Sequence, residues 1–202
     1  MLRDVVCRVA SRGRRRAGDR DPGGLRMWKV VVVAACCVWL AGCSSMSVRS
    51  LTANANLAPT KGNQASGTVT FVQHGETVMV EAHLTGLSPG LHGFHIHEKG
   101  DCTAADASSA GGHFNPHKSS HGSPDSQPHH AGDLGNVTAD AAGVVQYRVE
   151  VTGISLGTGT DSIIGRSVIV HANPDDLRSQ PAGNAGPRLA CGLISKGKDK
   201  WF

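Results

Sequence analysis

Residues 90–98 read Gly-Leu-His-Gly-Phe-His-Ile-His-Glu, and within them Phe94 and Ile96 alternate with His95 and His97. Alternation with a period of two is typical of a β-strand, in which side chains at i and i+2 share one face roughly 6–7 Å apart. The stretch therefore predicts a strand over 91–97 with two imidazoles on the same face. Two imidazoles placed in this way can converge on one metal ion.

Further strand-like runs lie on both sides of this stretch, separated by glycine-rich turns. They span residues 51–57, 67–73, 77–84, 135–138, 143–151 and 166–171. The sequence Gln73-His-Gly-Glu76 reads as a hairpin turn between two of them. No helical period is sustained after residue 43, so the pattern favours an antiparallel β-sandwich or barrel. The two long connections, 98–132 and 171–188, begin or end at candidate ligands, which favours a functional role for both loops.

Five more potential ligands stand in short motifs that suit turns or strand ends. They are His113 in His-Phe-Asn-Pro, His121 before glycine, His130 and Asp133 in His-Ala-Gly-Asp, and His171 after Val-Ile-Val. Three or four imidazoles, from His95, His97 and His171 with one more, suit Cu(II). A set of His121, His130 and Asp133 with a fourth ligand suits tetrahedral zinc. His113 lies between the two sets in the sequence, and as an imidazolate it could bridge two ions.

Less specific interpretations of the histidines stay open at this point. A single His-x-His on a strand also arises from packing, and a histidine-rich loop can buffer zinc loosely. Four histidines lack a motif and are expected on the surface: His74, His83, His117 and His129. His92 is expected to pack beneath the site.

The first 50 residues are interpreted as an extension, an export signal and a tether. With the domain that follows, they divide the chain into four segments. Residues 1–26 are rich in arginine and are interpreted as a disordered or misassigned extension, with a twin-arginine export signal at 14–16 as the alternative. Residues 27–42 form a secretory signal of the lipoprotein type, with an apolar run too short to span a bilayer. Its ending, Leu-Ala-Gly-Cys43, resembles a bacterial lipobox, so Cys43 is expected to carry a lipid; an uncleaved anchor is the alternative. Residues 43–50 are a polar tether, and 51–202 are the functional domain.

The formal net charge of +4 belongs to the N-terminal segment and not to the domain. Nine of the 20 Lys and Arg residues, but only three of the 16 Asp and Glu, lie in residues 1–42. The remainder carries 11 basic and 13 acidic residues, a net of −2, and gives no argument for nucleic-acid binding.

Two of the six cysteines, Cys102 and Cys191, fall in the domain. In an exported protein they are expected to form a disulfide, with two free buried thiols as the alternative.

Taken together, these motifs resemble the copper/zinc superoxide dismutase family. The matching strings are Gly90–Glu98, Gly-His-Phe-Asn-Pro at 112–116, His121-Gly, His-Ala-Gly-Asp-Leu-Gly-Asn-Val-Thr at 130–138, Ile-Gly-Arg-Ser-Val-Ile-Val-His at 164–171, and Gly-Asn-Ala-Gly-Pro-Arg-Leu-Ala-Cys-Gly at 183–192. They cover almost all of residues 50–195 in the order of the family. The resemblance implies an eight-stranded antiparallel Greek-key sandwich or flattened barrel with two long functional loops.

The resemblance also implies a role for each site residue. One copper per subunit would be held by His95, His97, His113 and His171, and one zinc by His113, His121, His130 and Asp133. Asp175 would hydrogen-bond one copper-ligand and one zinc-ligand imidazole, Arg188 would attract the anionic substrate beside copper, and Cys102–Cys191 would be the disulfide. The segment 171–188 is shorter than in the animal enzymes, and Ala182 stands where those enzymes usually have threonine.

The function implied is dismutation of superoxide to dioxygen and hydrogen peroxide by copper cycling between Cu(II) and Cu(I), with His113 bridging copper to a structural zinc. His113 and Arg188 would be the catalytic residues, and the protein would protect the cell envelope or periplasm as a lipid-anchored monomer or homodimer. A non-catalytic copper-binding module and an exported metal buffer are the alternatives. The complete ligand set and Arg188 favour the enzyme.

Overall fold

The computed structural model describes residues 49–198, 200 and 201. The predicted N-terminal extension, signal and lipidation site, and all but the last two residues of the predicted tether, lie outside the described residues. No helix in the described residues is long and apolar enough to cross a bilayer.

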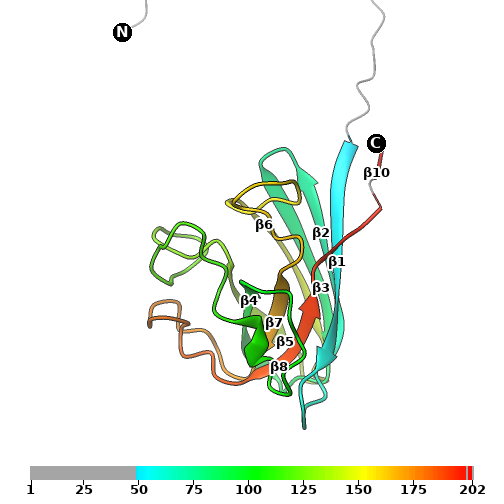
Figure 1. The fold of residues 1–202 in the computed structure, drawn as a ribbon. Helices are drawn as coiled ribbons and strands as arrows, with labels where there is room; N and C mark the ends of the chain where they lie inside the picture. Colours follow the sequence, from blue (N-terminus) through cyan, green and yellow to red (C-terminus); the bar gives the residue numbers. More distant parts are fainter. Residues whose placement is uncertain (1–48, 199, 202) are drawn as a thin grey trace, which may run out of the picture. The chain divides into compact units, whose positions relative to one another are not determined.

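The described residues form an all-β fold with one short 3₁₀ turn (Figure 1). The elements are β1 (Arg49–Pro59), β2 (Ser66–His74), β3 (Thr77–Thr85), β4 (Gly90–His97), η1 (Ser108–Ala110), β5 (Asp133–Ala139), β6 (Val145–Val151), β7 (Ser167–His171), β8 (Arg188–Leu193), β9 (Ser195–Lys196) and β10 (Lys200–Trp201).

Eight strands form one antiparallel sheet in the order β5-β4-β7-β8-β1-β2-β3-β6, and the short β9 and β10 pair with β1. The two end strands, β5 and β6, are consecutive in the chain and joined by a tight turn in which Asp140 N–H bonds Val144 C=O. The Tyr147 hydroxyl on β6 also donates to the Leu134 carbonyl on β5 over 2.9 Å. The sheet therefore curls until its ends meet and is nearly a closed barrel, which confirms the predicted fold class.

The barrel interior is filled by the inward-facing residues of strands whose alternation could be read in the sequence. Val69 and Phe71 of β2, and Val78 and Val80 of β3, are fully buried, whereas their neighbours are partly or fully exposed. Burying a side chain of this size is worth about 1.5–3 kcal/mol. β4 and β7 differ, because both of their faces are covered: one by this core and the other by the metal-ligand loops.

The predicted strands all exist, with small changes at their ends. β1 begins at Arg49, two residues inside the predicted tether, and it is longer than the predicted run 51–57. β8 was not predicted as a strand, although its motif was noted. It lies between β7 and β1 and pairs with both, through registers such as Ile169↔Cys191 and Ala58↔Cys191.

The predicted disulfide joins Cys102 in the long loop to Cys191 in β8, 89 residues apart. Beside it, Ala107, Ala110 and Ile169 form a second small buried cluster that is separate from the main core. The loop 98–132 is also fastened to β4, because Phe114 N–H bonds Ile96 C=O and Ile96 N–H bonds Gly132 C=O. The loop 172–187 is held to β4 as well, where Gly93 N–H bonds Asn173 C=O. Backbone hydrogen bonds thus hold both long loops against β4.

Candidate metal centre

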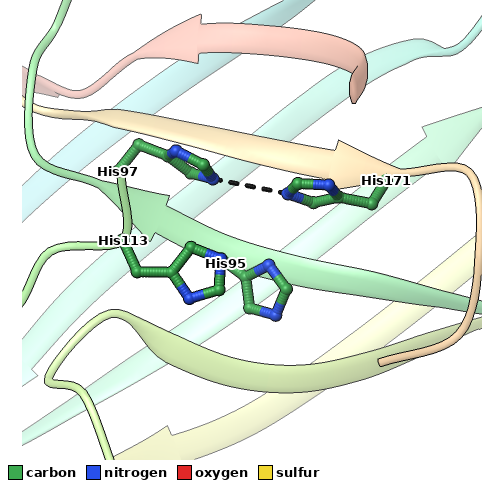
Figure 2. A group of neighbouring side chains, drawn as sticks. All are labelled: His95, His97, His113 and His171. Atoms are coloured by element: carbon green, nitrogen blue, oxygen red, sulfur yellow. Dashed lines mark hydrogen bonds between the residues drawn. The ribbon is translucent and has the colours of Figure 1, made fainter. Parts of the chain in front are cut away.

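Four histidines from three parts of the chain meet on the loop-covered face of the sheet (Figure 2). His95 and His97 project from β4, His171 ends β7, and His113 comes from the long loop through a bridge to His97. All four are buried, and each offers one ligand atom that lies within 4.8 Å of the others. We call His95, His97, His113 and His171 the copper group.

In three of these imidazoles, the ring nitrogen that points away from the other histidines of the group makes a hydrogen bond that orients the ring. His97 Nδ1 bonds the Gly111 carbonyl over 3.0 Å, and His171 Nδ1 bonds the Gly186 carbonyl over 3.1 Å, so each ring turns Nε2 inward. These two Nε2 atoms lie 3.3 Å apart. His95 is reversed, because its Nε2 bonds Asp175 over 2.8 Å and its buried Nδ1 has no hydrogen-bond partner. Such outward bonds fix the tautomer that a metal-binding histidine needs.

A second set of four ligands surrounds one carboxylate oxygen. Asp133 Oδ1 lies 2.8 Å from Nδ1 of His113, 3.0 Å from Nδ1 of His121 and 3.3 Å from Nδ1 of His130. The other carboxylate oxygen, Oδ2, accepts main-chain N–H groups of Gly122 and His130 and is thereby fixed. We call His113, His121, His130 and Asp133 the zinc group; three nitrogens and one oxygen match a tetrahedral zinc site.

His113 belongs to both groups and presents a different nitrogen to each. Its Nδ1 contacts Asp133 in the zinc group, whereas its buried Nε2 has no hydrogen-bond partner and belongs on the side of the copper group. The His113 and His95 rings lie 4.0 Å apart between centroids. A buried nitrogen without a partner is costly in a finished structure, so Nε2 of His113 and Nδ1 of His95 are explained if metal takes the missing place.

Asp175 connects the two groups from the loop 172–187. Its Oδ2 accepts from His95 Nε2 and its Oδ1 from His121 Nε2, over 2.8 and 2.9 Å. The main chain of Asp175 is in turn held by the Asn136 side chain on β5, which bonds both its N–H and its C=O over 2.7 and 2.9 Å. A rigid strand therefore sets the position of the carboxylate that orients one ligand of each group.

Comparison with known proteins places this arrangement in one family. The family model described as copper/zinc superoxide dismutase matches residues 65–194. The chain belongs to the copper/zinc superoxide dismutase family. The extracellular copper/zinc superoxide dismutase of Caenorhabditis elegans is 50% identical over 134 residues, which are 63% of this chain and 60% of the nematode protein. Superoxide dismutase [Cu-Zn] 2 of Mesembryanthemum crystallinum is 49% identical over 139 residues, 65% of this chain and 88% of the plant protein.

Copper and zinc are the metals of a copper/zinc superoxide dismutase, and the donor sets of the two groups fit them. Imidazole nitrogens alone make up the copper group, and they suit copper. The zinc group adds a carboxylate. Membership of the family and these two groups together support superoxide dismutation as the activity of the chain.

Three of the four copper-group imidazoles, those of His97, His113 and His171, are held in the neutral form that binds metal. Burial lowers the pKa of His171 to about 3 and that of His113 to about 4, and it places the pKa of His97 well below its usual value. Neighbouring imidazoles and the Arg188 guanidinium lower the pKa of His97 and His171 further. These three rings are therefore already neutral at pH 7, so no proton competes with a metal ion for their ligand nitrogens.

His121 in the zinc group behaves in the opposite way when no metal is bound. Burial alone would lower its pKa, but the Asp133 and Asp175 carboxylates, 3.0 and 2.9 Å from its two ring nitrogens, outweigh burial and raise its pKa to about 9. Against burial, contacts with His113, His121 and His130 place the pKa of Asp133 well below the usual range. Contacts with His121 and His95 do the same for the pKa of Asp175. His121 is therefore protonated near pH 7. This proton must leave before the ring can bind zinc.

We expect zinc binding to the metal-free protein near pH 7 to release about one proton from His121, because only the neutral ring is a ligand. Since the pKa of His121 is raised, its protonation stabilises the metal-free fold below about pH 6.5, and this contribution is lost as pH rises toward about 9. Zinc affinity should accordingly rise between those values. Titration calorimetry in two buffers of different protonation enthalpy measures the proton. The Asp175→Asn variant should release less, and no release in the parent protein would contradict the assignment.

Arg188 begins β8 beside His171, its partner in the strand register. Its guanidinium donates to the carbonyls of Ala107 and Gly111, and the Gly111 carbonyl also accepts from His97 Nδ1. Burial lowers the pKa of Arg188, but a guanidinium stays charged at any physiological pH. Arg188 is thus a half-buried fixed cation at the edge of the copper group.

The remaining histidines lie outside both groups. His92 is buried and bonds the carbonyls of His171 and Ser88, as expected of a packing histidine beneath the site. His74, His83 and His117 are exposed, and His129 is half-buried. Ala182 lines a small pocket with His171 at the mouth of the site.

Three residues that orient ligands were not predicted from the sequence: Gly111, Asn136 and Gln180. Asn136 could have been found, because it stands inside a quoted motif.

Proposed function

We propose that this protein converts two superoxide ions and two protons into dioxygen and hydrogen peroxide, with the copper group and the zinc group holding the ions for which they are named. The observation that carries the proposal is His113, whose Nδ1 faces the zinc group and whose unpartnered Nε2 faces the copper group. A metal buffer would need no such shared ligand.

Copper, held by His95, His97, His113 and His171, would supply the one-electron chemistry of both half-reactions, and zinc would be held by His113, His121, His130 and Asp133. The chain supplies the rest. His113 Nε2 can hold a proton between the two halves of the reaction and deliver it to the peroxide product. Arg188 attracts and orients the anion beside the copper group, and the carbonyls of Ala107 and Gly111 fix its guanidinium.

The test of this function is the decay of superoxide in the presence of the protein loaded with copper and zinc, measured as superoxide-dependent dye reduction. The enzyme should accelerate decay catalytically, at a rate that depends on added copper and falls with ionic strength. A metal buffer would bind both ions and leave superoxide to decay at its spontaneous rate, which would refute the proposal.

Replacement of Arg188 by alanine should lower the activity by about tenfold to a hundredfold, since one charge-assisted contact to an anion is worth roughly 1.5–3 kcal/mol. The content of both metals, measured by elemental analysis, should not change, because Arg188 is in neither ligand group. Arg178→Ala is the matched control, an exposed arginine of the loop 172–187 that leads into β8. Activity of Arg188→Ala equal to the parent at low salt would contradict the role.

We also propose that the protein is exported to the periplasm or cell envelope and anchored through a lipid on Cys43. The support is the signal pattern of residues 27–42, the Cys102–Cys191 disulfide, which is typical of an oxidising compartment, and the extracellular location in the name of the nematode relative. Labelling of cells with a radioactive fatty acid tests the anchor. Label should enter the protein and be lost in Cys43→Ser, and an unlabelled parent protein would refute it.

A further inference from the structure

The loop 172–187 forms hydrogen bonds with the main chain of His121 as well as with its ring. The Gln180 side chain lies along the His121 backbone: its Oε1 accepts the His121 N–H over 2.8 Å, and its Nε2 donates to the His121 carbonyl over 2.9 Å. The same Nε2 also donates to the Arg178 carbonyl over 3.1 Å. One side chain thereby serves both main-chain polar groups of a zinc-group residue.

His121 has few other means of keeping its position. It lies in a stretch without regular secondary structure and is only 3% exposed. Within the described part of the chain, the only hydrogen bonds of its main chain are those with Gln180. Buried main-chain groups require partners, so the amide of Gln180 takes the place that a neighbouring strand would fill in a sheet.

The ring of His121 is bound by the same loop, through Asp175 Oδ1. The fit between loop and ligand is close, because a Cβ on Gly183 would lie 1.8 Å from Asp175 Oδ1 and 2.6 Å from His121 Nε2. Gln180 and Ala182 of this loop also line the pocket beside His171. The loop at the mouth of the copper group is therefore the loop that positions a zinc-group ligand.

We propose that Gln180 is a positioning residue for the zinc ion, acting through the main chain of His121 and tying the loop 172–187 to this zinc-group ligand. The proposal rests on the proposed function only in naming zinc as the occupant of the group. Gln180 differs from Asn136, which makes the same kind of paired contact with Asp175 but stands on a strand. Gln180 is an exposed loop residue whose type gives no hint of a role at a metal site.

Loss of the Gln180 amide should loosen His121 without removing any ligand. Residues that orient metal ligands typically change metal affinity by about tenfold to a hundredfold when they are replaced. We therefore expect Gln180→Ala to release zinc at least about tenfold faster than the parent. Gln180→Glu keeps the acceptor for the His121 N–H but loses both donated bonds, so it should fall between the two.

The experiment uses the full chain loaded with copper and zinc and follows zinc transfer to a coloured chelator, with hydrogen exchange at the His121 amide as a second readout. The matched control is Gln146→Ala, an exposed glutamine of β6 whose side chain makes no hydrogen bond within the described residues. The proposal predicts faster release and faster His121 exchange in Gln180→Ala, protection of that amide in Gln180→Glu, and no change in Gln146→Ala.

Two results would overturn the proposal. One is zinc release from Gln180→Ala within about twofold of the parent, because positioning effects at metal ligands are larger. The other is faster release in both Gln180 variants with unprotected His121 amides in each and an equal loss of thermal stability without metal, which would indicate a general structural role. Neither readout uses superoxide, so an inactive protein that retains zinc through Gln180 would refute the proposed function and leave this inference standing.

Discussion

The rate of superoxide dismutation should fall by about 10²- to 10⁴-fold when His113 is replaced by alanine, the range that a positioned proton donor contributes. His113 is the one residue common to the two ligand groups found in the described part of the chain. Without it, each group retains three ligands, so both ions can still bind, but the nitrogen that passes a proton to the product is absent. The rate is measured by dye reduction on protein whose metal content is known.

His83→Ala is the matched control for this variant, since His83 is an exposed histidine of β3 outside both groups. It should retain the activity and metal content of the parent. A His113→Ala protein that holds both ions and keeps more than about a tenth of the parent activity would contradict the role of His113 as proton donor.

Removal of the disulfide should have the largest effect on stability. The double variant Cys102→Ser, Cys191→Ser opens a connection between residues 89 apart, for which the chain-entropy model gives about 4–5 kcal/mol of lost stability. The bond also holds the segment that supplies the carbonyls of Ala107 and Gly111 to Arg188. We therefore expect the metal-free variant to unfold at lower denaturant concentration and the loaded variant to lose activity as well.

The chemically reduced parent protein is the control, because it lacks the same bond without any substitution. Its unfolding midpoint should coincide with that of the double variant and lie well below that of the oxidised parent. A difference in unfolding free energy between the oxidised parent and the variant of less than about 1 kcal/mol would contradict the stabilising role, since it falls far below the chain-entropy value.

The strands that could be predicted from the sequence are those whose two faces differ. β2 and β3 alternate buried and less buried residues, and β4 alternates apolar residues with histidines, so a period of two is visible in each. β8, Arg-Leu-Ala-Cys-Gly-Leu, has no such alternation, because three consecutive residues, 190–192, are buried. Gly192 breaks the apolar pattern, yet its place is structural: a Cβ there would lie 2.7 Å from the Asn56 carbonyl oxygen.

The ligand sets could be read from motifs, but the contacts that orient them could not. The strand spacing of His95 and His97 follows from residue order alone, whereas the pairing of Gln180 with His121 joins positions 59 residues apart in two irregular loops. Neither loop has a period that would indicate which residues meet. Backbone carbonyls such as that of Gly111 carry no side-chain signal, although this one accepts from both His97 and Arg188.

In the proposed enzyme His113 joins two ions through its two nitrogens. Electron paramagnetic resonance of the protein loaded with Cu(II) in the copper group and Co(II) in the zinc group tests it most directly, because a shared imidazolate couples the unpaired electrons of the two ions. If His113 is shared, the copper signal seen with zinc is lost or strongly altered when cobalt replaces zinc. A copper signal that is the same with zinc and with cobalt, in protein proven to contain both ions, would contradict it.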